Sequence, residues 1–579
     1  MGSIPNIKLK ISPEELQGSG LDEKEAAWLS EKIAGLKEGS PSGVWQALSK
    51  TVLTPHMPFE LHRTLYAHTY RDWDEQQLGP RPAWIPSEAE KARTNLAKLL
   101  PGDDLKSLHH HSIHAPEIYW PNILSALRIN FHKPPKKMVR LVDDVEKASW
   151  FPDSKLNIAT SCFDRRRSGD VVLIWQKEGG SLHRMKRQEL QARVRQIAVA
   201  LREAGFEPGD AVGLQMPMTM DAICIYLGIV WAGCVVVSID ESLSGKEAKE
   251  CLDIVQAKGL FTQRILYGET TPGPLYEELV EAQAPKIILC GEGQADKLPV
   301  RPEDLAWDDF LALAKEDEAV AGYAPYIALS DAVTNIHFSF AEGQGPKAVP
   351  WTQVTPIKAA ADAWAHQDIQ IGDVVAWPSN LGSMTGPWLI YAALLNGGTI
   401  ALFEGAAHDR AFGEFVEEAQ VNMLGVSPSL VRAWRTSGCM SGLAWESIKC
   451  FSSTGEPSNE EDMHWLMAHA GYKPVIEYCG GSEIGGGCLT GSLVQPQAPA
   501  TFSTKAMGTD FLIINESGEE TKDGELALVP PLLGSSSTLL NQDHHEAYFA
   551  GMPKGPKGQK LRRHGDSMTQ LPGGYFRRT

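Results

Sequence analysis

The sequence predicts an α/β protein in which parallel-rich sheets are layered with helices, with a helical N-terminal extension and a small β-subdomain. Three observations indicate this fold class. Apolar segments of strand length alternate with helix-length segments from about residue 170, which is typical of parallel sheets covered by helices. After about residue 500 the pattern changes to antiparallel hairpins. The 579 residues also exceed one ordinary domain of about 100–200 residues.

Residues 1–135 are expected to form the extension, because they contain short helical segments, such as residues 23–36, and several prolines. Four of its histidines suggest a metal site: His109, His110, His111 and His114. No carboxylate or cysteine completes a ligand set there at a suitable spacing. We therefore favour a solvated loop over a metal site at these histidines.

Residues 136–500 are expected to form the α/β core. Helical spacing of apolar residues predicts a helix over 190–201, ended by Gly205, and a buried helix over 222–232. The predicted strands are residues 171–175, 211–215, 235–239, 286–289, 371–377, 399–403 and 422–426. The apolar stretch 222–239 is long enough to consider a membrane span. Gly228, Gly233 and the β-branched residues 235–237 favour a buried helix running into a buried strand instead.

Residues 501–579 are expected to form the β-subdomain. Residues 511–514 and 525–529 are apolar, and a turn at residues 516–518 lies between them. This arrangement predicts a pair of antiparallel strands.

The charge balance excludes some classes of partner. With 54 Lys+Arg against 72 Asp+Glu, the net charge is −18, which argues against a nucleic-acid coat because phosphate backbones attract basic surfaces. The net charge does not exclude a local basic patch that binds an anionic cofactor. The nine cysteines include no CxxC pair, so we expect free thiols in a reducing compartment and no zinc site. We also expect no signal peptide, and the last residues do not match a Ser-Lys-Leu peroxisomal signal.

Three short segments carry groups suited to chemistry. They are residues 453–457 (STGEP), residues 478–487 (YCGGSEIGGG), and Gly565-Asp566 followed by Gly574. Glycines allow a backbone to approach a ligand closely, Glu483 can hold a hard cation such as Mg²⁺, and Ser482 can donate to a phosphate. The alternative for the second segment is a flexible turn with an ordinary surface acid.

Together, and in this order, these segments resemble the AMP-forming adenylating (acyl-CoA synthetase) superfamily. The resemblance is to its acetyl-CoA synthetase-like members, and most closely to the plant peroxisomal acyl-activating enzymes. The matching stretches are residues 150–158 (WFPDSKLNI), Gly209-Asp210, Met216-Pro-Met218, Gly455-Glu-Pro457, Ser482-Glu483, and Asp566 with seven residues before Gly574. The resemblance extends from about residue 150 to residue 579.

The resemblance implies a large domain with two sheets and a reaction in two steps. A small-molecule carboxylate and ATP give an acyl-adenylate and pyrophosphate, and CoA then displaces AMP. On this reading the protein positions reactants and neutralises phosphate charge. The roles implied are an adenine pocket from Gly455, Glu456 and Pro457, phosphate contacts from Ser339, Ser482 and Lys347, Mg²⁺ held by Glu483, and ribose bound by Asp566. Glu483 and Lys347 are the expected catalytic residues.

The acyl pocket is expected beside Gly480 and Gly481. Where acetyl-CoA synthetases have the second tryptophan of their WWQTE motif, this chain has Gly480. Loss of an indole predicts space for a substrate larger than acetate.

The phosphate loop departs from the family pattern. Residues 339–348 keep Ser339, Pro346 and Lys347, whereas Phe340, Ala341, Glu342, Gly343 and Gln344 replace family hydroxyls and glycines. Glu342 places a negative charge where phosphate oxygens are expected, so we expect weak or absent ATP binding. Cys251 lies near the position of a family arginine that contacts CoA phosphates.

The family continues beyond the position of Thr579 with a small C-terminal lid that carries a catalytic lysine, and the chain ends before it. We therefore expect impaired adenylation. The alternative function is a non-catalytic protein of the same fold that binds a nucleotide or a partner. The resemblance implies a peroxisomal location, with the cytoplasm as the alternative.

Overall fold

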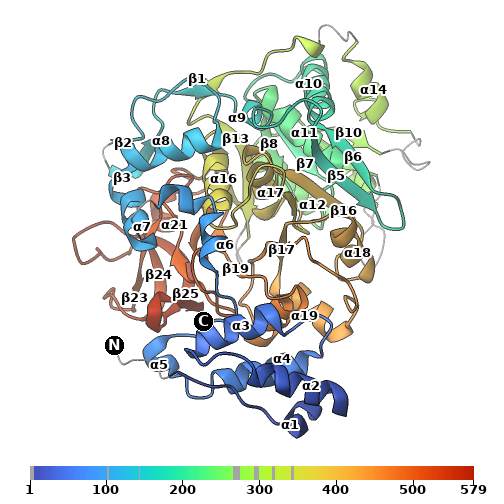
Figure 1. The fold of residues 1–579 in the computed structure, drawn as a ribbon. Coiled ribbons are helices and arrows are strands. Elements are labelled where there is room, and N and C mark those ends of the chain that lie inside the picture. Colours follow the sequence, from blue (N-terminus) through green and yellow to red (C-terminus); the bar gives the residue numbers. More distant parts are fainter. Residues whose placement is uncertain are drawn as a thin grey trace.

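The structure is a computed structural model that describes residues 6–100, 104–142, 144–264, 274–291, 299–315, 320–340 and 345–579. It confirms the α/β class with two large, mostly parallel sheets layered with helices. Figure 1 shows the helices that precede residue 80 grouped below these sheets, and the C-terminal β-strands beside them.

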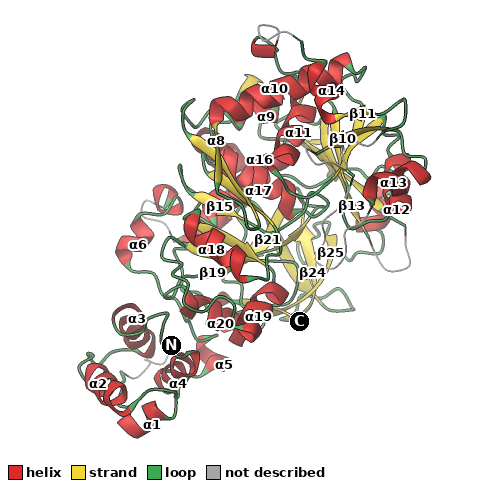
Figure 2. Cartoon of the chain, turned by 90° about the vertical axis from the view of Figure 1, so that its right-hand side faces the viewer, coloured by secondary structure: helices red, strands yellow, loops and turns green. Residues whose placement is uncertain are grey.

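The first part of the chain is helical. Its elements are α1 (Pro13–Gln17), α2 (Glu23–Ala34), α3 (Pro41–Thr51), α4 (Phe59–Thr69), α5 (Glu75–Leu78), α6 (Glu88–Ala92), the 3-10 helix η1 (Leu96–Leu99), α7 (Leu105–His114) and α8 (Pro116–Leu127). Trp45 and Leu65 from this region share one hydrophobic core with residues of the second large sheet and its helices. His62 Nδ1 lies 3.0 Å from the hydroxyl of Tyr472. These helices are therefore packed on the α/β core (Figure 2).

The expected loop at the four histidines is wrong, because the segment is helix α7. Asp104 caps the helix through the Ser107 amide, and Leu105 and Leu108 are buried on one face. His109 Nε2 lies 2.9 Å from the carbonyl oxygen of Thr509. Among the described residues, these histidines do not form a group of three potential metal ligands.

The first large sheet has the strand order β11-β10-β9-β7-β8-β13-β14. Its pairs are parallel except for β13 with β14, which is antiparallel. The strands are β7 (Ala211–Gln215), β8 (Val235–Ser238), β9 (Gly259–Gln263), β10 (Lys286–Cys290), β11 (Leu305–Ala306), β13 (Val333–Ser339) and β14 (Lys347–Thr352). The antiparallel pairing places Ser339 opposite Lys347 at the ends of these two strands.

The second large sheet has the order β19-β18-β17-β15-β16-β5-β6, and it is parallel except for β5 with β6. The strands are β5 (Val171–Lys177), β6 (His183–Lys186), β15 (Val374–Ala376), β16 (Thr399–Glu404), β17 (Met423–Val426), β18 (Cys450–Ser453) and β19 (Val475–Glu477). The parallel order confirms the sequence-based expectation for this region.

Helices α16 (Thr355–Ala365) and α17 (Thr385–Leu395) are buried along their whole lengths, and Figure 2 shows them in the centre of the molecule. A helix surrounded by protein must pair its polar groups internally. Lys358 forms an ion pair with Asp362, and Asp362 also accepts from the Tyr478 hydroxyl at 2.7 Å and the Gly487 amide at 2.8 Å. This network joins α16 to the glycine-rich segment at residues 478–487.

His366 follows α16 and is completely buried. Its Nδ1 lies 2.9 Å from the Gly491 carbonyl oxygen, and its Nε2 accepts from the Met507 amide at 3.1 Å. These bonds require a neutral ring with the proton on Nδ1. Burial lowers the pKa of His366 to about 4, in agreement with this arrangement.

Further helices cover the two sheets. They are α9 (Ile158–Ser161), α10 (Arg187–Glu203), α11 (Met220–Trp231), α12 (Gly245–Ile254), α13 (Leu275–Glu281), α14 (Trp307–Ala312), α18 (Arg410–Glu418), α19 (Pro428–Ser437) and α20 (Glu460–His469). The apolar stretch at 222–239 is α11 followed by β8, as predicted from its glycines and β-branched residues. No helix within the described residues has the length and apolar character needed to cross a bilayer.

The remaining strands form small sheets. They are β1 (Phe131–Lys133), β2 (Val139–Val142), β3 (Asp144–Trp150), β4 (Lys155–Leu156), β12 (Ala328–Leu329), β20 (Cys479–Gly481), β21 (Gly486–Thr490), β22 (Thr504–Lys505), β23 (Asp510–Ile514), β24 (Asp523–Val529), β25 (Arg562–Gln570) and β26 (Phe576–Arg578), with helix α21 (His544–Tyr548) and the 3-10 helix η3 (Pro572–Gly574). Strands β23 to β26 form the antiparallel β-subdomain that the sequence predicts. Strands β20 to β22 form a second antiparallel sheet.

Candidate active site

A cavity of about 340 Å³ lies where β18, the β20–β21 hairpin and β25 meet. Ligand sites of open α/β sheets commonly lie beyond the carboxyl ends of parallel strands, and the loop after β18 forms one wall of this cavity. The predicted residues that line it are Lys347, Gly455, Glu456, Gly480, Gly481, Glu483 and Asp566. The three short sequence segments, residues 453–457, residues 478–487 and the segment with Asp566, therefore converge on one cavity.

The loop after β18 is shaped by Gly455. Its φ of +96° is in the region that favours glycine. Apart from the two neighbouring residues, no atom lies within 4 Å of the position that a Cβ would take. Glu456 is exposed, and its Oε1 accepts from the Ser429 hydroxyl at 2.7 Å. The backbone of this loop thus leaves the cavity open at Gly455.

Glu477, at the end of β19, also lines the cavity and was missed by the sequence analysis. Its Oε2 accepts from the Ser458 hydroxyl at 2.8 Å, whereas its buried Oε1 has no hydrogen-bond partner among the described residues. Burial raises the pKa of Glu477 to about 7. Glu477 therefore adds an acceptor with no partner among the described residues to the lining of the cavity.

Lys347 and Glu483, which also line the cavity, form a partly buried ion pair with 3.0 Å between Nζ and Oε1. Burial alone would lower the pKa of Lys347 and raise that of Glu483, but each charge overcomes this effect in its partner, so the pKa of Lys347 is raised and that of Glu483 is lowered. The Lys347 ammonium is 5.0 Å from the Tyr548 ring centre, and Arg562 is 3.9 Å from the same centre. Two cations and one carboxylate therefore face this end of the cavity.

Arg562 is a second residue that the sequence did not identify. It is 2% exposed, and its Nη2 donates to the Glu483 carbonyl oxygen at 3.3 Å. Its Nε is buried and has no hydrogen-bond partner within the part of the chain that the structure describes. Arg562 therefore adds a cationic donor to the lining of the cavity.

Asp566, on β25, has different partners at its two oxygens. Oδ1 accepts from Arg578 at 2.8 Å. Oδ2 accepts from the Cys479 thiol at 3.2 Å and lies 3.4 Å from His564 Nδ1. The carboxylate is thus held at the cavity wall by groups from β20, β25 and β26.

Gly480 and Gly481 line the cavity, and their role in an acyl pocket stays a prediction, but the space at Gly480 differs from the expectation. A Cβ on Gly480 would lie 1.9 Å from the carbonyl oxygen of Gly486 in the paired strand. The direction in which an indole would extend is therefore filled by the backbone of β21. At this position the glycine permits the close approach of two strands.

Three predicted residues do not line the cavity: Ser339, Pro457 and Ser482. Ser482 contributes its carbonyl oxygen, which accepts from the Trp351 indole at 2.7 Å. Of the altered phosphate loop, Ala341, Glu342, Gly343 and Gln344 lie outside the described residues. Cys251 is fully buried in α12.

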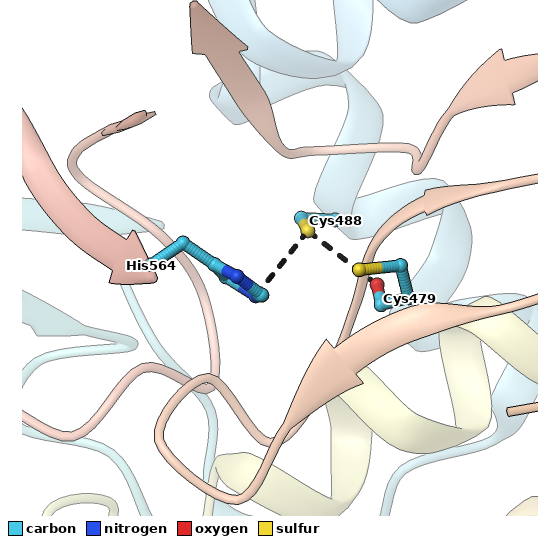
Figure 3. Close-up of side chains that lie close together, drawn as sticks. All are labelled: Cys479, Cys488 and His564. Atoms are coloured by element: carbon cyan, nitrogen blue, oxygen red, sulfur yellow. Dashed lines mark hydrogen bonds between the residues drawn. The ribbon is translucent and has the colours of Figure 1, made fainter. Parts of the chain in front are cut away.

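A group of three side chains next to Asp566 was not visible in the sequence: Cys479, Cys488 and His564 (Figure 3). The Cys488 thiol lies 3.7 Å from His564 Nε2 and 3.4 Å from the Cys479 carbonyl oxygen. Burial would raise the pKa of Cys488, but the Cys479 thiol and His564 lower it overall. The spacing of these residues in the sequence did not indicate the group, because the three side chains come from β20, β21 and β25.

Family models match most of the chain. A model described as AMP-binding enzyme covers residues 163–528. The chain belongs to this family. A second family model, described as acetyl-coenzyme A synthetase N-terminus, matches residues 105–162. A third, described as the SAM domain of probable acyl-activating enzyme 17/18, matches residues 8–71. The resemblance inferred from the GEP, Ser-Glu and Asp motifs is thereby confirmed.

Similar proteins extend this finding. Probable acyl-activating enzyme 17, peroxisomal, from Arabidopsis thaliana is 40% identical over 98% of this chain and 82% of its own length. Hexanoyl-CoA synthase from Cannabis sativa is 41% identical over 95% of this chain and 79% of its own. The structure of acetoacetyl-CoA synthetase from Streptomyces lividans aligns with a TM-score of 0.77 at 21% identity, over 86% of this chain and 80% of that one, and it confirms the fold.

These findings place the protein among the AMP-forming acyl-CoA ligases, which use ATP, Mg²⁺ and CoA. They favour the enzyme over the non-catalytic alternative. The expected impairment of activity stays a prediction.

Proposed function

We propose that the cavity beside Gly455, Glu477, Lys347 and Asp566 is the adenylation site of an acyl-CoA ligase that acts on carboxylates larger than acetate. The observation that carries the proposal is the convergence of the three sequence segments on one cavity, whose lining also includes Glu477 and Arg562, each with a buried side-chain atom that has no partner among the described residues. One is an acceptor and the other a cationic donor. Adenosine phosphates offer both complements, an exocyclic amine and anionic oxygens.

The nucleoside end fits the wall formed by β18 and β25. The open backbone at Gly455 allows the adenine ring to lie against the loop, with Glu456 and Pro457 continuing it. The amine of adenine would donate to Glu477. Asp566 can accept from ribose hydroxyls because an ionised carboxylate is an acceptor only.

The phosphate end fits the charged wall. Lys347 and Arg562 stabilise negative charge that develops on the α-phosphate as the substrate carboxylate attacks. Glu483 supplies one hard oxygen ligand, and Mg²⁺ in such sites needs only one or two carboxylates together with phosphate oxygens. A bound Mg²⁺ supplies neutralisation of phosphate charge. Ser339, which pairs with Lys347 across β13 and β14, and Ser482, which precedes Glu483, are neighbours of this wall but do not line the cavity.

The substrate size rests on the relatives and not on Gly480. The similarity to hexanoyl-CoA synthase supports a carboxylate longer than acetate. The name of the Arabidopsis relative, which includes the word peroxisomal, supports a peroxisomal location.

The proposal is tested by ATP–pyrophosphate exchange with hexanoate and with acetate, together with AMP binding by calorimetry. We expect exchange that is faster with hexanoate, and at least tenfold slower exchange in Glu483→Gln. Glu418→Gln, an exposed change at the end of α18, is the matched control and is expected to leave exchange unchanged. Absence of both exchange and AMP binding in the unaltered chain would overturn the proposal.

A further inference from the structure

The cluster of Cys479, Cys488 and His564 has the donor set of a transition-metal site. One ligand atom from each residue lies within 4.8 Å of the other two, and the Cys488 thiol is 3.7 Å from His564 Nε2. In tetrahedral Zn²⁺ sites, bonds of about 2.3 Å to sulfur and about 2.0–2.1 Å to nitrogen place ligand atoms roughly 3.5–3.8 Å apart. Side-chain movements of about 1 Å or less therefore convert the observed arrangement into a metal site.

The backbone holds two of the ligands in place. Cys479 begins β20 and Cys488 lies in β21, and the two strands pair as an antiparallel hairpin with an irregularity between residues 479 and 480. His564 comes from β25, on the other side of the cluster (Figure 3). Ligands placed on strands are positioned more accurately than ligands on loops.

The orientation of His564 is a second, independent observation. Its Nε2 faces Cys488, and its buried Nδ1 makes no hydrogen bond with any described residue, although Asp566 Oδ2 is 3.4 Å away. In metal sites a ligating histidine commonly donates its other ring N–H to a carboxylate, which fixes the tautomer. Metal ligation at Nε2 would place the proton on Nδ1, and that proton would point to Asp566.

The site has an entry path. Cys479 and His564 line the 340 Å³ cavity, whereas Cys488 is completely buried behind them. Three protein ligands leave a fourth position on the cavity side for water or a bound molecule, as in open zinc sites. Thiolate and imidazole together select thiophilic divalent cations over Mg²⁺ or Ca²⁺.

We propose that Cys479, Cys488 and His564 bind a thiophilic divalent cation of the Zn²⁺ type, with Asp566 as the acceptor that orients His564. This departs from the expectation of no zinc site, which rested on the absence of a CxxC pair. The inference does not depend on the ligase reaction, since the ligands are read from their own geometry. Its test likewise uses metal binding and not catalysis.

The test is titration of the reduced full-length chain with Co²⁺, which reports ligand type through its absorption spectrum. We expect one equivalent to bind, with a thiolate-to-cobalt charge-transfer band and the intense visible bands of a tetrahedral ion. Zn²⁺ should displace the Co²⁺ and remove both features. Cys488→Ser and His564→Asn should each weaken binding at least tenfold, and Asp566→Asn by about 10–100-fold, as is usual for the partners of metal ligands.

Cys439→Ser is the matched control, because this cysteine is partly exposed and lies outside the cluster. It should bind Co²⁺ as the unaltered chain does. Alkylation of the native chain, followed by mass spectrometry, keeps the test informative if a variant does not fold: Zn²⁺ should protect Cys479 and Cys488. The proposal is overturned by the absence of a charge-transfer band, by an unchanged band in Cys488→Ser, or by a Cys479–Cys488 disulfide that persists under reducing conditions.

Discussion

Replacement of Gly480 by alanine tests whether this glycine serves the strand pairing or the size of the acyl pocket. The added Cβ would lie 1.9 Å from the Gly486 carbonyl oxygen, whereas real Cβ contacts stay beyond 3.0 Å. Strands β20 and β21 must therefore separate locally by about 1 Å. Overpacking of this kind costs about 1–3 kcal/mol, and weakening of one strand-to-strand hydrogen bond adds about 0.5–1.5 kcal/mol. We expect a destabilisation of about 2–4 kcal/mol.

The assay is thermal and urea-induced unfolding of the variant beside Gly169→Ala. Gly169 is exposed, and a Cβ there meets no atom within 4 Å, so this control should change the stability by less than about 0.5 kcal/mol. Gly480→Ala should lower Tm by several degrees relative to the control. Equal stability of the two variants would refute the steric reasoning.

The same variant separates the two explanations of substrate size. If Gly480 leaves room for a longer acyl chain, alanine should shift the preference between hexanoate and acetate without loss of stability. The strand-packing explanation predicts loss of stability and an unchanged ratio of the two exchange rates. A stable variant with a shifted ratio would restore the pocket explanation.

Other expected outcomes follow from buried polar groups. Asp566→Asn should weaken AMP binding by about 5–150-fold, corresponding to about 1–3 kcal/mol, and calorimetry of Asp523→Asn, an exposed carboxylate of β24, should show no change. Lys358→Met should destabilise the fold by about 3–5 kcal/mol in urea unfolding, because Asp362 is left as a buried unpaired charge. His366 has a pKa of about 4 when folded and about 6.5 when unfolded, so the unfolded chain binds the extra proton between these values and stability falls as the pH falls from 6.5 to 4. In His366→Gln, the free energy of unfolding measured in urea should therefore depend less steeply on pH, with a slope smaller by at most about 1.4 kcal/mol per pH unit. An unchanged slope would contradict the assignment of His366 as a neutral buried ring.

Much of the fold could be predicted because the hydrophobic periodicity of a helix or strand is a local property of the sequence. The strand predicted at 211–215 is β7 with the same bounds, since all five of its residues are buried. The strand predicted at 371–377 is shorter, at Val374–Ala376. Ile371 is apolar but 57% exposed, so it does not belong to the buried strand. Gly372 has a φ of +90° and lies in a turn that precedes the strand.

The histidine segment shows a different limit. Its polarity suggested a loop, but a helix needs only one buried face, and Leu105 and Leu108 supply it. His109 is then brought against Thr509, four hundred residues away. No local sequence pattern predicts that contact.

Residues that line the cavity could be predicted where a residue type is tied to a backbone motif, and not where a tertiary contact brings the side chain there. Gly455 and Asp566 lie in motifs and line the cavity. Glu477 and Arg562 belong to a β-strand each, and their sequence neighbours are ordinary for strands. What marks them is an unsatisfied buried atom, and this property exists only after β19, β25 and the loop after β18 have enclosed one space.

Asp566 makes contacts that its sequence motif does not predict. Its motif indicates a ribose contact, but Oδ2 also faces Cys479 and His564. If that oxygen orients His564 beside a bound cation, only Oδ1 is left for a nucleotide, and Arg578 already donates to Oδ1. If one carboxylate serves both proposed groups, occupancy of the metal site would change the hydrogen bonds available to ribose. The two proposed sites would then be coupled through a single side chain, whichever of them is occupied first.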